Sequence, residues 1–114
     1  ADGIWASNTG GRQLDGICST INDLPEITAA VARQAPIIFD SGIRRGQDVF
    51  KALALGADLV AVGRTPLYGL HFGGYLGVAS VLEHLRTELL NTMLLSGVAN
   101  IKELKTAVRV EFHK

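Results

Sequence analysis

The polar stretch from Ser7 to Asp15 combines residue types that can hold an anionic group. It reads SNTGGRQLD and directly follows the apolar run GIWA at 3–6. Arg12 stands after two glycines, and a guanidinium is always charged and can bind a carboxylate through two parallel hydrogen bonds. An ion pair with a structural acid such as Asp15 is the alternative for this arginine. The stretch therefore predicts either a carboxylate site or a local ion pair.

Two further stretches join glycine to arginine in a way that suits a phosphate group. They read DSGIRRG over 40–46 and GRT over 63–65. Glycine lets backbone N–H groups approach an anion closely, a helix N-terminus adds positive potential, and arginine supplies forked donors. The alternative treats the glycines as turn residues and the arginines as solvated charges, and spacing alone leaves both interpretations open. The residues concerned are Gly42, Gly46, Gly63, Arg44, Arg45 and Arg64.

Each of these polar stretches follows a predicted β-strand. Apolar runs at 3–7, 36–40 and 59–62 predict three strands, and a continuous apolar run is typical of a parallel strand covered on both faces. Helical segments are predicted between the strands, which indicates an α/β fold with parallel strands and right-handed crossovers. The carboxyl ends of parallel strands share one edge of the sheet, where ligands bind in such folds. We therefore expect the polar stretches to lie close together.

The helix between the first two strands is predicted to open at Asp23. Asp23 suits the N-cap, Pro25 the first turn, and Glu26 the third position of a capping box. Its expected inner face consists of Ile27, Ala30 and Val31.

The later helices are predicted from apolar spacing and capping residues. A second helix is expected at 46–55, closed by Gly56, with Val49, Phe50 and Leu53 on its packed side. A longer helix is expected over 74–96, and a small terminal helix is expected to start at Asn100. The stripe of the longer helix, interpreted as packing surface, comprises Val78, Val81, Leu82, Leu85, Leu89 and Met93.

Composition indicates one globular domain over residues 1–114. Eleven basic and eleven acidic residues give no net charge, which argues against nucleic-acid or membrane binding, and no metal site is predicted. Cys18 has no partner for an internal disulfide and is expected to be a small, partly buried residue, which fits a reducing cytoplasm. The chain begins with Ala1 and lacks a secretion signal, so a cut or processed chain is expected.

A three-stranded parallel sheet would leave two open edges and an uncovered apolar face. Side chains such as Ile37 and Phe39 are expected on that face. Either further strands of a larger barrel cover these surfaces or copies of the chain associate, so an oligomer or a joined barrel half is expected.

Three segments resemble the C-terminal part of the FMN-dependent α-hydroxy acid oxidases and dehydrogenases. They read SNTGGRQLDG from Ser7, PIIFDSGIRRGQDVFKALALGAD from Pro36 and VAVGRTPLYGL from Val60. The Asp-Ser-Gly form of the second segment and the later stretch LHFGGYLG resemble the L-lactate oxidases in particular. The resemblance covers nearly the whole chain. It implies a partial domain, about the last three βα units of an FMN-binding TIM (β/α)8 barrel, with a long C-terminal helix.

The resemblance also implies roles for individual residues. Arg12 matches the arginine that binds the substrate carboxylate. The flavin contacts are matched by Asp40, Gly42, Arg44, Gly63 and Arg64, the last four of them around the FMN phosphate. Members of the family transfer a hydride equivalent from the α-carbon of an L-2-hydroxy acid to the flavin, and the product is the 2-oxo acid.

Thr9 departs from the pattern of the family. The family reads Ser-Asn-His-Gly where this chain reads SNTG, so a threonine stands at the position of the catalytic base. A neutral hydroxyl cannot accept a proton near neutral pH as an imidazole can. The segments that in the family hold the flavin ring and supply a substrate-binding tyrosine are missing from the resemblance, and Tyr68 and Tyr75 are not assigned that role. The expected surface or packing histidines are His71, His84 and His113.

Two functions of different classes fit these residues. The first is the C-terminal part of an FMN-dependent oxidoreductase that oxidises an L-2-hydroxy acid such as L-lactate, inactive on its own. The second is a non-catalytic, self-associating half-barrel that binds FMN or another phosphate ligand weakly or has a structural role only. A third possibility is that Thr9 reflects an altered chemistry on the same cofactor.

Overall fold

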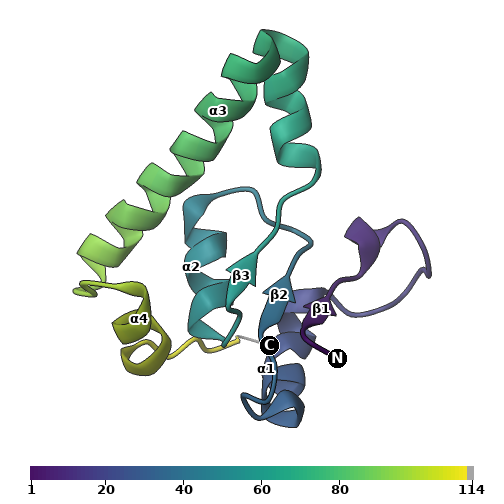
Figure 1. The fold of residues 1–114 in the computed structure, drawn as a ribbon, viewed down its shortest axis with the longest axis vertical. Helices are drawn as coiled ribbons and strands as arrows, with labels where there is room; N and C mark the ends of the chain where they lie inside the picture. Colours follow the sequence, from purple (N-terminus) through teal and green to yellow (C-terminus); the bar gives the residue numbers. More distant parts are fainter. Residues whose placement is uncertain (113–114) are drawn as a thin grey trace.

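The computed structural model describes residues 1–112 as a three-stranded parallel sheet with helices on one side and a projecting helical hairpin (Figure 1). The strands are β1 (Ile4–Ala6), β2 (Ile37–Phe39) and β3 (Leu59–Val60), in the order β1-β2-β3. The helices are α1 (Thr20–Val31), α2 (Gly46–Ala54), α3 (Arg64–Leu95) and α4 (Ile101–Ala107), with a 3-10 turn η1 (Thr9–Gly11). The predicted α/β fold with parallel strands is confirmed.

The core lies between the sheet and its two covering helices, α1 and α2. Ile37 and Phe39 of β2 are buried there together with Leu24 of α1 and Ala52 of α2. The prediction that Ile37 and Phe39 lie on the uncovered face is therefore wrong. Side chains alternate between the two faces along a strand, so the residues between the buried ones lie on the open face of the sheet. On that face Trp5 and Leu59 are about 60% exposed.

Helix α1 begins earlier than its capping residues predict. It starts at Thr20 after Ser19, and Pro25 lies inside the helix instead of in its first turn. The extra turn buries Leu24 and packs Ile21 against the core, and this burial outweighs the hydrogen bond that Pro25 cannot donate. Of the predicted inner face, Ile27 and Val31 pack against the core, whereas Ala30 is exposed.

Helices α2 and α4 follow their predictions closely. Helix α2 ends at Ala54, and its side chains Val49, Phe50 and Leu53 pack into the core as expected. The terminal helix begins at Asn100, whose side chain accepts a hydrogen bond from the Glu103 amide at 2.9 Å. The two helices contact one another.

Helix α3 is a hairpin of two helical arms. It begins at Arg64 and is interrupted where Gly73 and Gly74 leave the helical conformation, so its longer arm confirms the helix predicted over 74–96. The arms 64–72 and 75–95 cross at Gly69 and Gly77, where an added Cβ would lie within 2.4 Å of the opposite carbonyl oxygen. Figure 1 shows the hairpin tip projecting away from the sheet, with the longer arm returning past α2 toward α4.

The predicted stripe of the longer arm is covered along part of its length. Leu85 and Met93 are buried and Leu89 packs beside them, whereas Leu82 is about half exposed. The hairpin tip carries the exposed aromatic residues Phe72 and Tyr75. Within residues 1–112, no helix is both long enough and apolar enough to cross a membrane.

The Asp58 carboxylate joins α4 to the sheet. Its two oxygens accept hydrogen bonds from Lys105 Nζ at 2.5 Å and from the Ile37 amide at 2.8 Å. The hydrogen bond from Lys105, then the one from Ile37, lowers the pKa of Asp58 below the ordinary 3.8, and partial burial opposes this only in part. A carboxyl whose pKa falls on folding stabilises the fold above its unfolded pKa. That contribution is lost as the pH falls through the folded pKa.

Asp58→Asn is expected to lower the free energy of unfolding by about 1 kcal/mol at pH 7, because a paired carboxylate is removed. The difference from the wild type should be smaller at an acidic pH below the lowered pKa of folded Asp58, because the carboxyl is then protonated in both states. Urea unfolding at the two pH values measures this. The exposed Asp23→Asn serves as the control, and an equal loss for Asp58→Asn at both pH values would contradict the assignment.

Candidate functional site

A polar cavity of about 330 Å³ lies at the carboxyl ends of all three strands. It is built from the loop after β1, the loop after β2 and the start of α3. All seven site residues predicted from the sequence line it, which are Thr9, Arg12, Asp40, Gly42, Arg44, Gly63 and Arg64. The structure thus brings together residues that are spread over more than fifty positions of the sequence.

The Asp40 carboxylate is held in place by hydrogen bonds from two strands. Trp5 Nε1 donates to one oxygen at 3.0 Å, and Ser41 Oγ donates to the other at 2.7 Å. Burial raises the pKa of Asp40, but hydrogen bonds from Ser7, Ser41 and Trp5 together outweigh it, so the net pKa lies below its ordinary value. Asp40 is therefore a fixed, ionised acceptor at the cavity wall.

The loop after β1 carries Thr9 and Arg12 in an unusual backbone conformation. Thr9 has φ +57°, which is rare for a β-branched residue, and its amide donates to Ser7 Oγ at 3.0 Å. Arg12 Nε donates to the Thr9 carbonyl oxygen at 3.1 Å, and the Arg12 side chain lines the cavity and is exposed. Asp15 accepts from the neighbouring Gly16 amide, and no ion pair within residues 1–112 joins it to Arg12.

Gly10 links this loop to the other two walls of the cavity. Its amide donates to Ser41 Oγ at 3.2 Å, and its carbonyl oxygen accepts from Arg64 Nη2 at 3.0 Å. Gly10 has φ +68°, and an added Cβ would lie 2.9 Å from Arg64 Nη2. The positive φ favours glycine here, and the absence of a side chain leaves room for the tip of Arg64.

Two carboxylates already occupy the first amides of α2. Asp48 accepts from the amides of Arg44 at 3.0 Å and Arg45 at 2.9 Å, and Glu88 accepts from the Gly46 amide at 2.7 Å. Glu88 also pairs with the Arg45 guanidinium at 2.6 Å, and these hydrogen bonds, first that from Arg45, lower its pKa. Arg45 and Gly46 therefore fit neither the phosphate site nor the alternative of a turn glycine and a solvated charge, because they form the packing of α2 on α3.

Gly42 and Gly63 face open space in the cavity. An added Cβ would meet no atom within 4 Å at either position. Gly42 needs glycine for its φ of +79°, but Gly63 has φ −110°, which any residue can adopt. No packing contact among the described residues explains a glycine at Gly63, and its backbone is open to the cavity. The guanidinium of Arg44 lies nearby, 3.5 Å from Thr65 Oγ1 in the first turn of α3.

Sequence reasoning missed three residues that organise this cavity, Trp5, Ser7 and Ser41. Each has a polar atom directed at Asp40 or at the loop after β1. The signal that could have identified Trp5 is its indole N–H, because a tryptophan in a short strand needs a hydrogen-bond acceptor for that group. The signal that could have identified Ser41 is its place beside Gly42 in a tight turn at a strand end.

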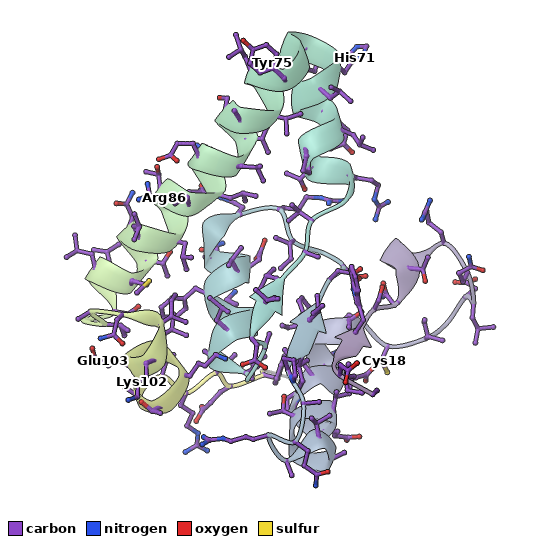
Figure 2. The ribbon with its side chains drawn as sticks, viewed as in Figure 1. Cys18, His71, Tyr75, Arg86, Lys102 and Glu103 are labelled. Atoms are coloured by element: carbon purple, nitrogen blue, oxygen red, sulfur yellow. The ribbon has the colours of Figure 1, made fainter. Side chains whose placement is uncertain are left out.

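His71, His84 and Cys18 lie outside the cavity lining. His71 is exposed at the hairpin tip (Figure 2), and His84 is exposed on α3, 3.4 Å from Glu88. His113 lies outside the described residues. Cys18 is exposed in the loop before α1, so the expectation of a partly buried cysteine is wrong, because that loop runs out into solvent.

Comparison with known proteins gives the family of this chain. A family model described as FMN-dependent dehydrogenase matches residues 1–110. The chain belongs to the FMN-dependent dehydrogenase family. The cofactor of this family is FMN. The proteins to which the chain is related are therefore flavoproteins that catalyse oxidation–reduction.

Members of this FMN-dependent dehydrogenase family with known activities share about half of their residues with the chain. L-lactate oxidase of Streptococcus iniae is 52% identical over 105 residues, which are 92% of this chain and 26% of that protein. 2-Hydroxyacid oxidase 1 of Homo sapiens is 51% identical over 109 residues, which are 95% of this chain and 30% of that protein. The chain therefore spans between a quarter and a third of the length of these relatives.

Solved structures of the same FMN-dependent family share the fold. A structure described as a lactate oxidase of Pediococcus acidilactici superposes with a TM-score of 0.90 at 57% identity, over 92% of this chain and 29% of that one. A mandelate oxidase superposes with a TM-score of 0.88 at 45% identity, over 92% of this chain and 32% of that one. The arrangement of strands, helices and hairpin is thus the arrangement of this part of the family fold.

Proposed function

We propose that the chain forms the C-terminal part of an FMN-dependent enzyme that oxidises an L-2-hydroxy acid such as L-lactate to the 2-oxo acid. In that assignment residues 1–114 are one partial-barrel domain, about the last three βα units of a TIM barrel. The observation that carries it is the single cavity lined by all seven residues that match the family's substrate and flavin positions. The open strand edges and the exposed Trp5 and Leu59 support the addition of further strands.

The cavity fits the phosphate end of FMN. Arg44 and Arg64 supply two guanidinium groups, and the open Gly63 backbone at the start of α3 lets an anion approach the helix N-terminus. Asp40, ionised and fixed by three donors, is placed to accept hydrogen bonds from hydroxyl groups of the flavin side chain. When bound, FMN supplies the acceptor for the hydride equivalent. The remaining work of binding and orienting the substrate falls to residues of the protein.

Arg12 binds and orients the substrate carboxylate in this proposal. Its Nε holds the Thr9 carbonyl, which fixes the side chain, while the two terminal nitrogens remain available for a carboxylate. Thr9 lines the cavity at the position of the family's base. Its hydroxyl cannot take the substrate proton near neutral pH, so the chain contributes binding and orientation without a general base. We therefore propose that it does not turn over substrate alone.

Arg12→Lys is expected to weaken the binding of oxalate or pyruvate by about tenfold or more, because an ammonium cannot form the paired hydrogen bonds of a guanidinium. Titration calorimetry of the complete protein with oxalate measures this. Arg33→Lys, an exposed arginine after α1, is the matched control and should leave the affinity unchanged. Unchanged oxalate affinity in Arg12→Lys would remove the assigned role.

The second candidate is a non-catalytic, self-associating half-barrel. The exposed sheet face around Trp5 and Leu59 favours it, because an apolar face of this kind needs a covering partner. Mass measurement of the purified protein together with its visible absorbance separates the candidates. A companion polypeptide or a longer chain with flavin absorbance supports the enzyme. A colourless homo-oligomer of this chain alone supports the half-barrel, and a compact monomer by sedimentation contradicts both.

The proposed setting is the cytoplasm. An exposed, unpaired Cys18 is compatible with a reducing compartment. Fractionation of cells followed by detection of the chain tests the assignment, and recovery from a secreted fraction would overturn it.

A further inference from the structure

Ser41 joins the Asp40 carboxylate to Gly10, in the loop that carries Thr9 and Arg12. Its hydroxyl donates to Asp40 Oδ1 at 2.7 Å and accepts from the Gly10 amide at 3.2 Å. A hydroxyl has one proton to donate and lone pairs to accept, so both bonds form at once. The two residues that it joins lie 30 positions apart and on neighbouring strand ends.

The backbone of Ser41 makes a serine unexpected at this position. Its φ is +82°, in the left-handed region that residues with a Cβ populate sparsely. The next residue, Gly42, has φ +79°, so the turn already uses glycine where the conformation demands it. Glycine at 41 would adopt the same turn without strain. A side chain held in such a conformation at a cavity wall indicates that the hydroxyl itself has a role.

The partners of Gly10 show what that role controls. Gly10 is fixed by two contacts from other segments, Ser41 at its amide and Arg64 at its carbonyl oxygen. Arg64 is expected to turn toward a phosphate when one is bound, since it lines the same cavity. The contact from Ser41 would then be the remaining side-chain tie between Gly10 and the rest of the site.

We propose that Ser41 is a positioning residue whose hydroxyl fixes the loop of residues 7–12 against Asp40, and thereby sets the place of Arg12 relative to the flavin side. The consequence for Arg12 rests on the proposed function, because it assumes that Arg12 binds a carboxylate. The contact with Gly10 is independent of that assumption. Ser41 is thus expected to affect carboxylate binding while leaving phosphate binding unchanged.

The test compares Ser41→Gly and Ser41→Ala with the wild type, in the protein as purified with any polypeptide that accompanies it. Ser41→Gly removes the hydroxyl and relieves the backbone, so it should fold at least as well as the wild type. Ser41→Ala removes the hydroxyl alone. Ser96→Gly, an exposed serine at the end of α3, is the matched control. Hydrogen exchange at the Gly10 amide, resolved by mass spectrometry, and titrations with oxalate and with inorganic phosphate are the three readouts.

Both variants are expected to speed exchange at Gly10 about fivefold to tenfold, because one hydrogen bond is lost. They should weaken oxalate binding by a similar factor and leave phosphate affinity within about twofold. Unchanged exchange at Gly10 would overturn the inference whether or not oxalate binds. Faster exchange with unchanged oxalate affinity would overturn it too, because the contact would then be merely structural. A wild-type protein that binds no oxalate would instead refute the role of Arg12, while exchange at Gly10 still decides the contact made by Ser41.

Discussion

Thr9→His is expected to raise the rate of L-2-hydroxy acid oxidation by about 10²-fold to 10⁴-fold in a protein that carries this chain together with the rest of the barrel. An imidazole titrates near neutral pH and can take the substrate proton, whereas a threonine hydroxyl cannot. Histidine also adopts positive φ more readily than a β-branched residue, so the φ of +57° at this position favours the substitution. Steady-state oxidation of L-lactate, measured against pH, reports both the gain in rate and the pKa of the new base.

Thr9→Asn is the matched control for this experiment. Asparagine tolerates the same backbone conformation and fills similar space, but it cannot accept a proton. Its rate should therefore stay at that of the wild type. A wild-type protein that already turns over at the rate of Thr9→His would show that a group other than residue 9 takes the proton. Equal gains from asparagine and histidine would point to relief of backbone strain instead.

Gly46→Ala is expected to lower the free energy of unfolding by about 3 kcal/mol, because the added Cβ has no room. It would lie 2.2 Å from the Leu89 nitrogen and 2.5 Å from the Leu85 carbonyl oxygen, both of them backbone atoms of α3 that cannot rotate away. In an isolated helix the same substitution would be stabilising. A decrease in the free energy of unfolding would therefore come from the contact with α3 alone. Urea unfolding of the two proteins measures the difference.

Gly63→Ala is the matched substitution, because it adds the same Cβ where no atom lies within 4 Å and at a φ of −110°. It should change the free energy of unfolding by less than about 0.5 kcal/mol. If the proposed phosphate site is correct, the same variant should lose affinity for FMN. Similar losses of stability in Gly46→Ala and Gly63→Ala would contradict the different reasons assigned here to the two glycines.

The convergence of the site was predictable from the sequence because it follows from topology. Each polar stretch comes after a strand, and parallel strands end at one edge of the sheet, so Arg12, Asp40 and Arg64 had to meet. Capping rules were equally successful where the cap is made by nearby residues, as at Asn100.

The failures concern contacts made by distant segments. The position of Pro25 suggested a helix start, but burial of Leu24 against the sheet extended α1 by a turn. In a continuous apolar strand the sequence does not show which alternate residues face the helices. Ile37 and Phe39 were therefore assigned to the wrong face of the sheet. The hydrogen bonds made to Asp40 and to Gly10 depend on where side chains from neighbouring strand ends point. The local sequence pattern does not determine those directions.

The crossing of Gly69 and Gly77 has a mechanical consequence for the hairpin. With no side chain between the two arms, neither arm can slide or roll without separating backbone surfaces that are already in contact. The close contact therefore ties the two arms together near the hairpin tip, where Phe72 and Tyr75 are exposed. The shorter arm starts at Arg64, which lines the cavity, whereas the longer arm is bonded through Glu88 to Arg45 in the packing of α2 on α3.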